Sequence, residues 1–135
     1  MPFVLDASVA LSWSLNEGSS YADGIMERLG KDVAIVPVLW PIEIANSLLV
    51  AERRGRLTQG EVARAIDLYL HSATSVQDVS AEMAFGPVFD LARQQRLTSY
   101  DATYLYLAMR EGLPLATLDG ALKAAAARVG VALVE

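Results

Sequence analysis

Short apolar runs alternate with longer helical stretches along this chain, and that alternation limits the possible folds most. The runs Phe3–Leu5, Val33–Val36 and Leu113–Thr117 are too short for helices and are typical of strands buried on both faces. Weaker strand patterns lie at residues 75–79 and 131–134. Strands that alternate with helices through short connections predict an α/β sandwich around a mostly parallel sheet.

The stretches between these runs carry clear helix signals. Apolar residues fall at helical spacing from 39 to 54, and Pro41 suits the first turn of that helix. The segment Thr58–Glu61 has the pattern of a capping box for the next helix. Ser80 can begin a further helix, in which Gly86–Pro87 predicts a kink or a late start.

The composition excludes several classes of protein. The 135 residues, 53% of them hydrophobic, suffice for one domain over residues 1–135 whose core needs no disulfide. No apolar run approaches the ~18 residues of a membrane span, and a first strand at Phe3 leaves no room for a signal peptide, so we expect a cytoplasmic protein. With no cysteine and a single histidine, His71, any metal must be held by oxygen ligands.

The charge distribution argues against a protein that grips nucleic acid mainly through a basic face. The formal net charge is -5, whereas phosphate neutralisation requires a cationic surface. Arginines nevertheless cluster at positions 53, 54 and 56, and again at 93 and 96. Solvated helix ends are the simplest explanation of the first cluster.

Four acidic residues are candidates for one shared site. Asp6 follows the first apolar run, Asp119 follows the Leu113–Thr117 run, and Glu43 lies in the first turns of the helix after the second run. The carboxyl ends of parallel strands lie at one edge of a sheet, so we expect these three side chains there. Asp101 opens a helix that follows another helix, so its presence at that edge is an inference.

Each acid also has a purely structural explanation. Asp119 and Asp6 can each cap the helix that follows, and Asp101 stands three residues after Thr98, as in a capping box. Acids are also favoured in any first helical turn by the helix dipole. Glu43 fits this explanation least well, because two isoleucines flank it in an apolar stretch where a solvated charge is not expected.

Together the four carboxylates predict a divalent-metal site. Carboxylates brought close together repel one another and raise each other's pKa unless a cation balances them. Oxygen ligands suit Mg²⁺ or Mn²⁺, and such a site favours phosphodiester chemistry. A serine-histidine-acid mechanism would need His71, whose place on a helix face favours a structural role.

Four sequence segments, in this order, span the chain nearly end to end. They are Val4–Ser8, Pro41–Asn46 with Arg53–Leu57 behind it, Ser99–Tyr104 and Leu115–Asp119. The ordered set resembles the PIN-domain ribonucleases, and within them the VapC-type toxins of bacterial toxin-antitoxin pairs. The resemblance implies a three-layer α/β/α sandwich, a homodimer, dependence on Mg²⁺ or Mn²⁺, endoribonuclease activity, and inhibition by a small cognate antitoxin.

The resemblance also implies roles for single residues. Carried over by position, Asp6 and Asp101 are direct metal ligands, and Glu43 and Asp119 complete the acidic quartet. Supporting roles, as groups that orient the carboxylates, fall to three further residues: Ser8, Asn46 and Thr117. For these three residues, roles in turns and helix caps are an equal alternative.

Other interpretations remain open from the sequence. The same metal site could serve a DNA nuclease or a phosphatase, and the fold could be a non-catalytic interaction module. The apolar helices between residues 19 and 56 could offer a groove to an antitoxin helix or form a dimer face. Five aromatic residues could stack on bases, although core packing explains them better: Trp13, Trp40, Tyr100, Tyr104 and Tyr106.

Overall fold

The computed structural model describes residues 1–15 and 17–135, and it contains a four-stranded sheet. The strands are β1 (Phe3–Leu5), β2 (Ala34–Pro37), β3 (Thr74–Gln77) and β4 (Leu115–Ala116). They lie in the order β3-β2-β1-β4, and every pairing is parallel. The predicted α/β sandwich with a mostly parallel sheet is therefore confirmed.

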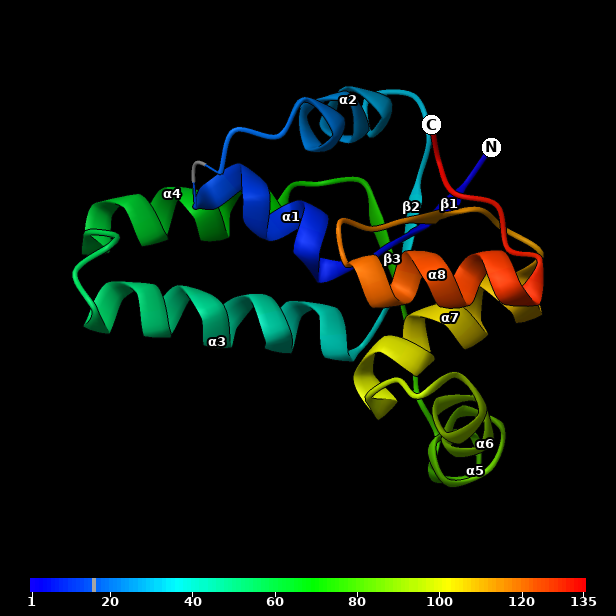
Figure 1. The fold of residues 1–135 in the computed structure, drawn as a ribbon. Coiled ribbons are helices and arrows are strands. Elements are labelled where there is room, and N and C mark those ends of the chain that lie inside the picture. Colours follow the sequence, from blue (N-terminus) through cyan, green and yellow to red (C-terminus); the bar gives the residue numbers. More distant parts are fainter. Residues whose placement is uncertain (16) are drawn as a thin grey trace.

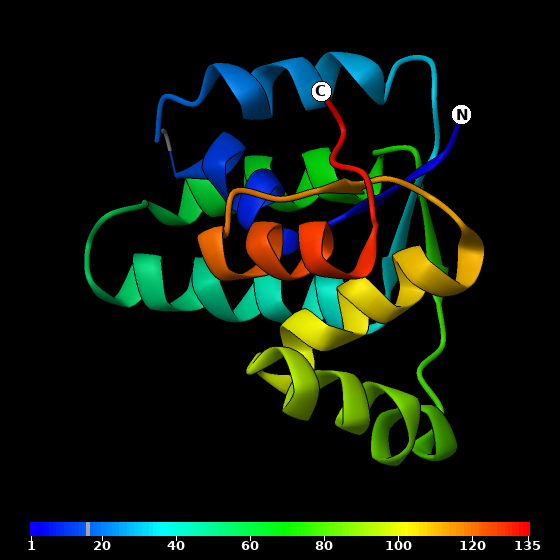
Figure 2. The same cartoon turned by 45° about the vertical axis from the view of Figure 1, so that its right-hand side comes forward.

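Eight helices of the described residues surround this sheet (Figure 1). They are α1 (Ala7–Ser14), α2 (Ser20–Arg28), α3 (Leu39–Arg53), α4 (Gln59–Leu70), α5 (Ala81–Phe85), α6 (Pro87–Gln95), α7 (Ser99–Glu111) and α8 (Gly120–Val129). Helices α3 and α4 run side by side as a pair that projects from the sheet (Figures 1 and 2). Helix α7 packs on β1, β2 and β4, and α5 and α6 lie at the lower side of the molecule beyond it.

Local sequence signals explain where several helices begin. Thr58 and Glu61 form the predicted capping box: the Thr58 hydroxyl accepts from the Glu61 N–H at 3.1 Å, and the Glu61 carboxylate accepts from the Thr58 N–H at 3.0 Å. Ser80 caps α5 through the N–H of Met83. The kink predicted at Gly86–Pro87 is a break between two helices, with the proline in the first turn of α6.

Three predictions about the fold are wrong. Tyr100, for which core packing was the preferred explanation, is 62% exposed at the start of α7. Residues 131–134 form no strand and contribute only an isolated parallel bridge between Leu115 and Leu133, because β4 offers just two residues to pair with. His71 is not inside a helix: it is the exposed C-cap of α4, where its ring Nδ1 lies 2.8 Å from the carbonyl oxygen of Asp67.

Strand β1 forms the centre of the core. Its three residues are fully buried, and they pair with β2 on one side and β4 on the other. Tyr104 and Leu105 of α7 are equally buried beneath the sheet. Because β1 is held on both sides, the residue that follows it, Asp6, has a fixed position at the carboxyl edge.

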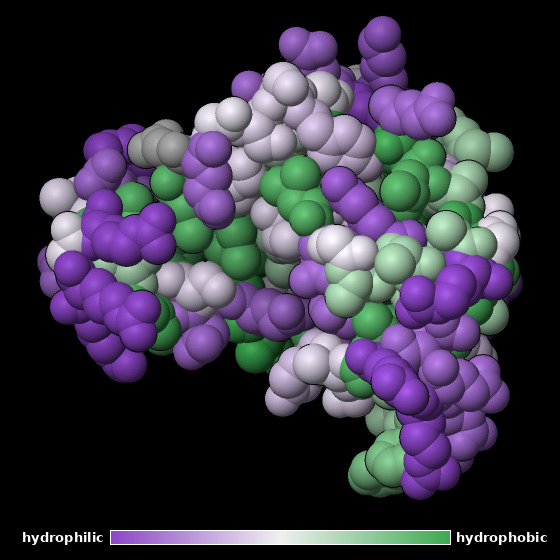
Figure 3. Space-filling model, viewed as in Figure 1, coloured by the Kyte–Doolittle hydropathy of each residue, from purple (hydrophilic) through white to green (hydrophobic). Residues whose placement is uncertain are grey.

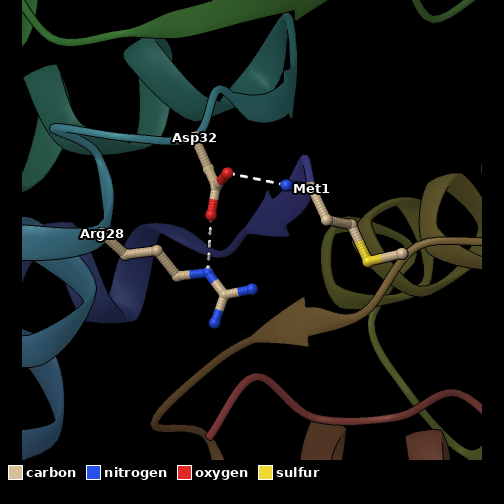
Figure 4. A network of polar contacts seen from close by, with 3 residues as sticks. All are labelled: Met1, Arg28 and Asp32. Atoms are coloured by element: carbon tan, nitrogen blue, oxygen red, sulfur yellow. Dashed lines mark hydrogen bonds and ion pairs between the residues drawn. The ribbon is translucent and has the colours of Figure 1, made fainter.

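An ion-pair network lies at the opposite, amino edge of the sheet (Figure 4). Asp32, just before β2, accepts from the amino group of Met1 at 2.7 Å and from Arg28 Nε at 3.2 Å. These contacts lower the pKa of Asp32, the hydrogen bond from the Met1 amine most of all. The Arg28 guanidinium also lies 5.6 Å from the centre of the Phe3 ring.

In the described part of the chain, no helix has the length and apolarity that crossing a membrane requires.

Candidate functional site

The first turns of α1, α3 and α8 approach one another where β1, β2 and β4 end, and α7 begins close by (Figure 1). Three of these helix starts carry a predicted acid at the N-cap or in the first turn, namely Asp6, Asp101 and Asp119, and Glu43 lies just beyond the first turn of α3. Helix N-termini carry a partial positive charge, which lowers the free-energy cost of placing carboxylates there. The fold therefore directs four acids from distant parts of the sequence to one edge of the sheet.

Asp6 is held by hydroxyl groups and does not act as a helix cap. Its Oδ2 accepts hydrogen bonds from Ser8 Oγ at 2.6 Å and from Thr117 Oγ1 at 2.7 Å. It stands at the N-cap position of α1, yet its side chain makes no capping hydrogen bond, so the capping alternative for Asp6 is wrong. The residue is 4% exposed, and this burial raises the pKa of Asp6 although both hydroxyls act to lower it.

The turn after β4 links Asp6 to Asp119. The backbone N–H of Asp6 donates to the carbonyl of Ala116 at 3.0 Å, which sets Asp6 beside Thr117. Thr117 Oγ1 in turn accepts from the N–H of Asp119 at 3.0 Å. Ser8 Oγ accepts from the N–H of Leu118 at 3.0 Å. Two hydroxyls thus orient one carboxylate and fix the loop that carries another.

Asp119 does cap its helix, as the structural explanation predicted. Its Oδ1 accepts from the N–H of Leu122 at 2.8 Å in the first turn of α8. The residue is partly exposed, and its charge raises the pKa of both Asp6 and Asp101. Asp119 therefore caps α8 and also belongs to the acidic group.

Glu43 has a hydrogen bond from a buried tyrosine and a raised pKa. Its Oε1 accepts from the buried Tyr104 hydroxyl at 2.9 Å. Burial first, then the charges of Asp6 and Asp101, raise the pKa of Glu43 to about 7 against the opposing effect of the tyrosine. Without a bound cation, these surroundings favour the protonated form of the Glu43 carboxyl group.

Asp101 lies in the first turn of α7. Its backbone N–H donates to Thr98 Oγ1 at 3.0 Å, so Thr98 caps the helix, but the Asp101 carboxylate accepts no hydrogen bond from the Thr98 N–H and the capping box is incomplete. Burial, followed by the charges of Asp6 and Asp119, raises the pKa of Asp101 to about 6. The carboxylate is thus partly buried beside two like charges.

None of the four acids forms an ion pair with a described lysine, arginine or histidine. Their chemistry fits Mg²⁺ or Mn²⁺, which prefer oxygen ligands, and burial first, then the neighbouring acids, raises the pKa of Glu43 and of Asp101. Within residues 1–15 and 17–135, however, no three acid or histidine side chains are gathered closely enough to form a ready metal cluster. The acids nevertheless act on one another electrostatically: Asp119 raises the pKa of Asp6, and Asp6 raises that of Glu43 and of Asp101.

The three supporting residues have different surroundings. Ser8 and Thr117 contact Asp6 directly. Asn46 is exposed one turn beyond Glu43 on α3 and lines a separate hollow, without a hydrogen bond to any acid in the described structure.

One residue that contacts the site was not expected from the sequence. Tyr104, expected in the core, is indeed buried there, but its hydroxyl also holds Glu43. The available signal was its spacing, because a residue three positions after Asp101 lies on the same face of a helix.

Comparisons with known proteins agree with this architecture. The family model for the PIN domain matches residues 3–128. A solved structure of PAE2754 from Pyrobaculum aerophilum has a TM-score of 0.71 and 26% identity, covering 93% of this chain and 79% of that one. Comparison with curated proteins gives no significant match.

Two further solved structures share the fold at lower identity. VapBC2 from Rickettsia felis, bound to a DNA fragment from their promoter, has a TM-score of 0.68 and 14% identity, covering 100% of this chain and 98% of that one. VapC20 from Mycobacterium tuberculosis, a sarcin-ricin loop cleaving toxin, has a TM-score of 0.62 and 19% identity, covering 93% and 95%. The match of the family model over nearly the whole chain confirms the resemblance seen in the sequence: this chain belongs to the PIN-domain family.

Proposed function

We propose that this chain is a metal-dependent endoribonuclease, a single domain over residues 1–135 that acts in the cytoplasm as the toxin of a toxin-antitoxin pair. The observation that carries the proposal is a group of four carboxylates without cationic partners, set at the carboxyl edge of a PIN-domain sheet. Its fold neighbours, a VapBC complex and a toxin that cleaves the sarcin-ricin loop, support a nuclease toxin.

Asp6 and Asp101 would hold Mg²⁺ or Mn²⁺, with Glu43 and Asp119 completing the set. The bound ion would supply a Lewis acid that polarises the scissile phosphate and offsets its developing charge. Ser8 and Thr117 keep the Asp6 carboxylate in one orientation by donating to its Oδ2.

Glu43 is suited to receive a proton from attacking water. Its Oε1 accepts from the Tyr104 hydroxyl, and burial raises the pKa of its carboxyl group, which favours accepting a proton. Hydrolysis with water as the nucleophile would leave 5′-phosphate and 3′-hydroxyl ends on the RNA. A dependence on Glu43 in this role would appear as a loss of rate below neutral pH.

A partner protein has a surface to bind. An apolar groove of about 390 Å³ lies between α3, α4 and β3, lined by Trp40, Ile44, Leu48, Ile66, Leu70 and Val76, among others. Leu70 is 76% exposed, and Ile42 on the same helix pair is 64% exposed. Apolar side chains exposed together favour a protein interface. This groove supports the proposed antitoxin partner, and we also propose that the chain forms a homodimer.

Cleavage by the purified protein tests the proposal. We expect Mg²⁺-dependent cutting of single-stranded RNA, its loss in excess EDTA, and its loss in Asp101→Asn with an unchanged circular dichroism spectrum. DNA and a phosphate monoester are parallel substrates. Cutting of DNA alone, hydrolysis of the monoester alone, or full RNA cleavage by Asp101→Asn would each reject the endoribonuclease assignment.

A further inference from the structure

We propose that Arg54 and Arg56 bind the phosphate backbone of the RNA strand at a subsite separate from the acids. This inference deepens the proposed endoribonuclease function and rests on it. It answers a physical difficulty, because an acidic site in a protein of net charge -5 repels the polyanion that it is proposed to cut. A bound cation offsets that repulsion only at the scissile phosphate.

Helix α3 connects the two places. Arg54, the C-cap of α3, stands eleven residues after Glu43. Eleven residues are close to three full turns at about 3.6 residues per turn, so the two residues lie on the same side of the helix. At about 1.5 Å of rise per residue, the two positions are ~16 Å apart along the axis. That separation suits a strand of a few nucleotides that enters at the arginines and reaches the acids.

A fixed turn sets the position of the arginines. After Arg54, the C-cap of α3, Gly55 adopts the left-handed conformation with φ of 74°. The N–H of Arg56 donates to the carbonyl of Ala51 at 2.8 Å, and the N–H of Gly55 donates to that of Glu52 at 3.0 Å. This pair of bonds is a Schellman motif, which returns the chain toward the helix that it leaves. Backbone hydrogen bonds therefore define the path of the chain at both arginines.

The two arginines line one hollow. It has a volume of about 320 Å³, and its lining also includes Asn46 and Ser47, one turn beyond Glu43 on α3. Leu15, at the C-terminal end of α1, closes it on the other side. In Figure 3, hydrophilic side chains gather over the end where α3 meets α4, and apolar surface lies between that end and the middle of the molecule. The hollow thus lies between two helices, α1 and α3, whose other ends carry acids.

The chemistry of the hollow suits a phosphate. A guanidinium group presents a planar fork of donors that matches phosphate oxygens, and Asn46 and Ser47 add neutral donors. No described acid forms an ion pair with Arg54 or Arg56. The dipole of α3 attracts cations to its last turn, which accounts for Arg53 and Arg54. It does not account for Arg56, which lies beyond the helix end and lines the same hollow.

Steady-state cleavage of a single-stranded RNA by the full chain with Mg²⁺ tests the assignment. In Arg54→Gln/Arg56→Gln we expect KM to rise about tenfold while kcat stays within about twofold. The slope of log KM against log salt should fall by about 1.4, because each single-strand phosphate that the protein no longer neutralises accounts for ~0.7. The matched control is Arg110→Gln/Arg128→Gln, which removes the same charge from the last turns of α7 and α8 and should retain the original KM and slope.

The outcomes separate this inference from the function on which it rests. No RNA cleavage by the unaltered protein would reject the proposed function and the phosphate subsite together. Cleavage by the unaltered protein with an unchanged KM in Arg54→Gln/Arg56→Gln would reject the subsite alone. An equal rise in KM in the control pair would show a general charge effect and also reject it. A normal KM with weakened binding of an acidic protein partner would assign the arginines to that partner.

Discussion

The two edges of the sheet hold carboxylates in opposite states. At the amino edge, Asp32 is paired with the Met1 amine and Arg28, and its pKa is lowered. At the carboxyl edge, Glu43 and Asp101 have no cationic partner among the described residues, and their pKa values are raised to about 7 and about 6. The charged form of a carboxyl group is thus favoured at the amino edge and disfavoured at the carboxyl edge, by burial first and then by neighbouring acids.

This difference separates a structural acid from a candidate functional one. An acid that serves only stability gains from a partner within the chain, as Asp32 does. Acids that are kept close together without such partners cost free energy of folding, and that cost is offset when a cation or substrate binds. The edge with unbalanced charge is therefore where a ligand is expected.

Neutralising one acid at each edge of the sheet should give the largest difference in the rate of RNA cleavage. We expect Asp6→Asn to lower the rate of RNA cleavage by at least about a thousandfold, because it removes a proposed metal ligand, while its melting temperature is retained. Asp32→Asn removes the same charge and should cleave at the original rate. Equal rates in the two variants would contradict the functional assignment of the carboxyl edge.

Removing one orienting hydroxyl should have a smaller effect on cleavage. Thr117→Val keeps the shape of this fully buried side chain and deletes the donor to Asp6 Oδ2 and the acceptor for the Asp119 N–H. We expect a loss of roughly 10- to 100-fold in kcat/KM, as for groups that orient metal ligands. Thr117→Ser, which keeps the hydroxyl, is the matched control and should lose much less. A Thr117→Val enzyme as active as the Thr117→Ser enzyme would show that this hydroxyl has no positioning role.

The pH dependence of stability should differ between the edges. The folded pKa values of Glu43 and Asp101, about 7 and about 6, exceed the ordinary values of 4.5 and 3.8, so the unfolded chain releases these protons first. Their contribution to stability is therefore fully present below about pH 4 and is lost as the pH rises to about 7. Urea unfolding without divalent ions measures this decline, which Glu43→Gln should reduce and Mg²⁺ should reverse. A flat profile between these pH values would contradict the raised pKa values.

Removing the ion pairs at the amino edge should have the smallest effect, a slight change in thermal stability. The pKa of Asp32 is lowered, so its stabilising effect is present above the ordinary value of 3.8 and disappears as the pH falls through the lower folded value. We expect Asp32→Asn to lower the melting temperature slightly at neutral pH, and less so in high salt, because the pairs are partly exposed and screened. A large loss that salt does not alter would point to a packing role instead.

Much of this molecule follows from sequence pattern. The runs that became β1, β2 and β4 are short and apolar, and the Thr58 capping box is a local signal that the structure reproduces. The carboxyl-edge rule for parallel sheets then placed Asp6, Glu43 and Asp119 without knowledge of side-chain contacts. Asp101 required the family resemblance, because it follows a helix and not a strand.

What the sequence did not reveal depends on long-range contacts. Tyr104 lies 61 residues from Glu43, and Thr117 lies 111 residues from Asp6, so only the folded chain shows these hydrogen bonds. The prediction of a strand at residues 131–134 was wrong because a strand needs a neighbouring strand to pair with, and β4 provides only two residues. The sequence around Asp6 could not show whether its carboxylate caps α1, because Thr117, one of the two residues that donate to it instead, lies near the other end of the chain.

Calorimetric titration with Mn²⁺ at neutral pH measures whether the carboxyl edge of the sheet holds a divalent cation. If the unbalanced acids at the carboxyl edge hold a divalent cation, the unaltered protein and Asp32→Asn will bind Mn²⁺ alike, and Asp6→Asn and Asp101→Asn will lose that binding. Binding that persists unchanged in both carboxyl-edge variants, or is absent from the unaltered protein, would contradict the account.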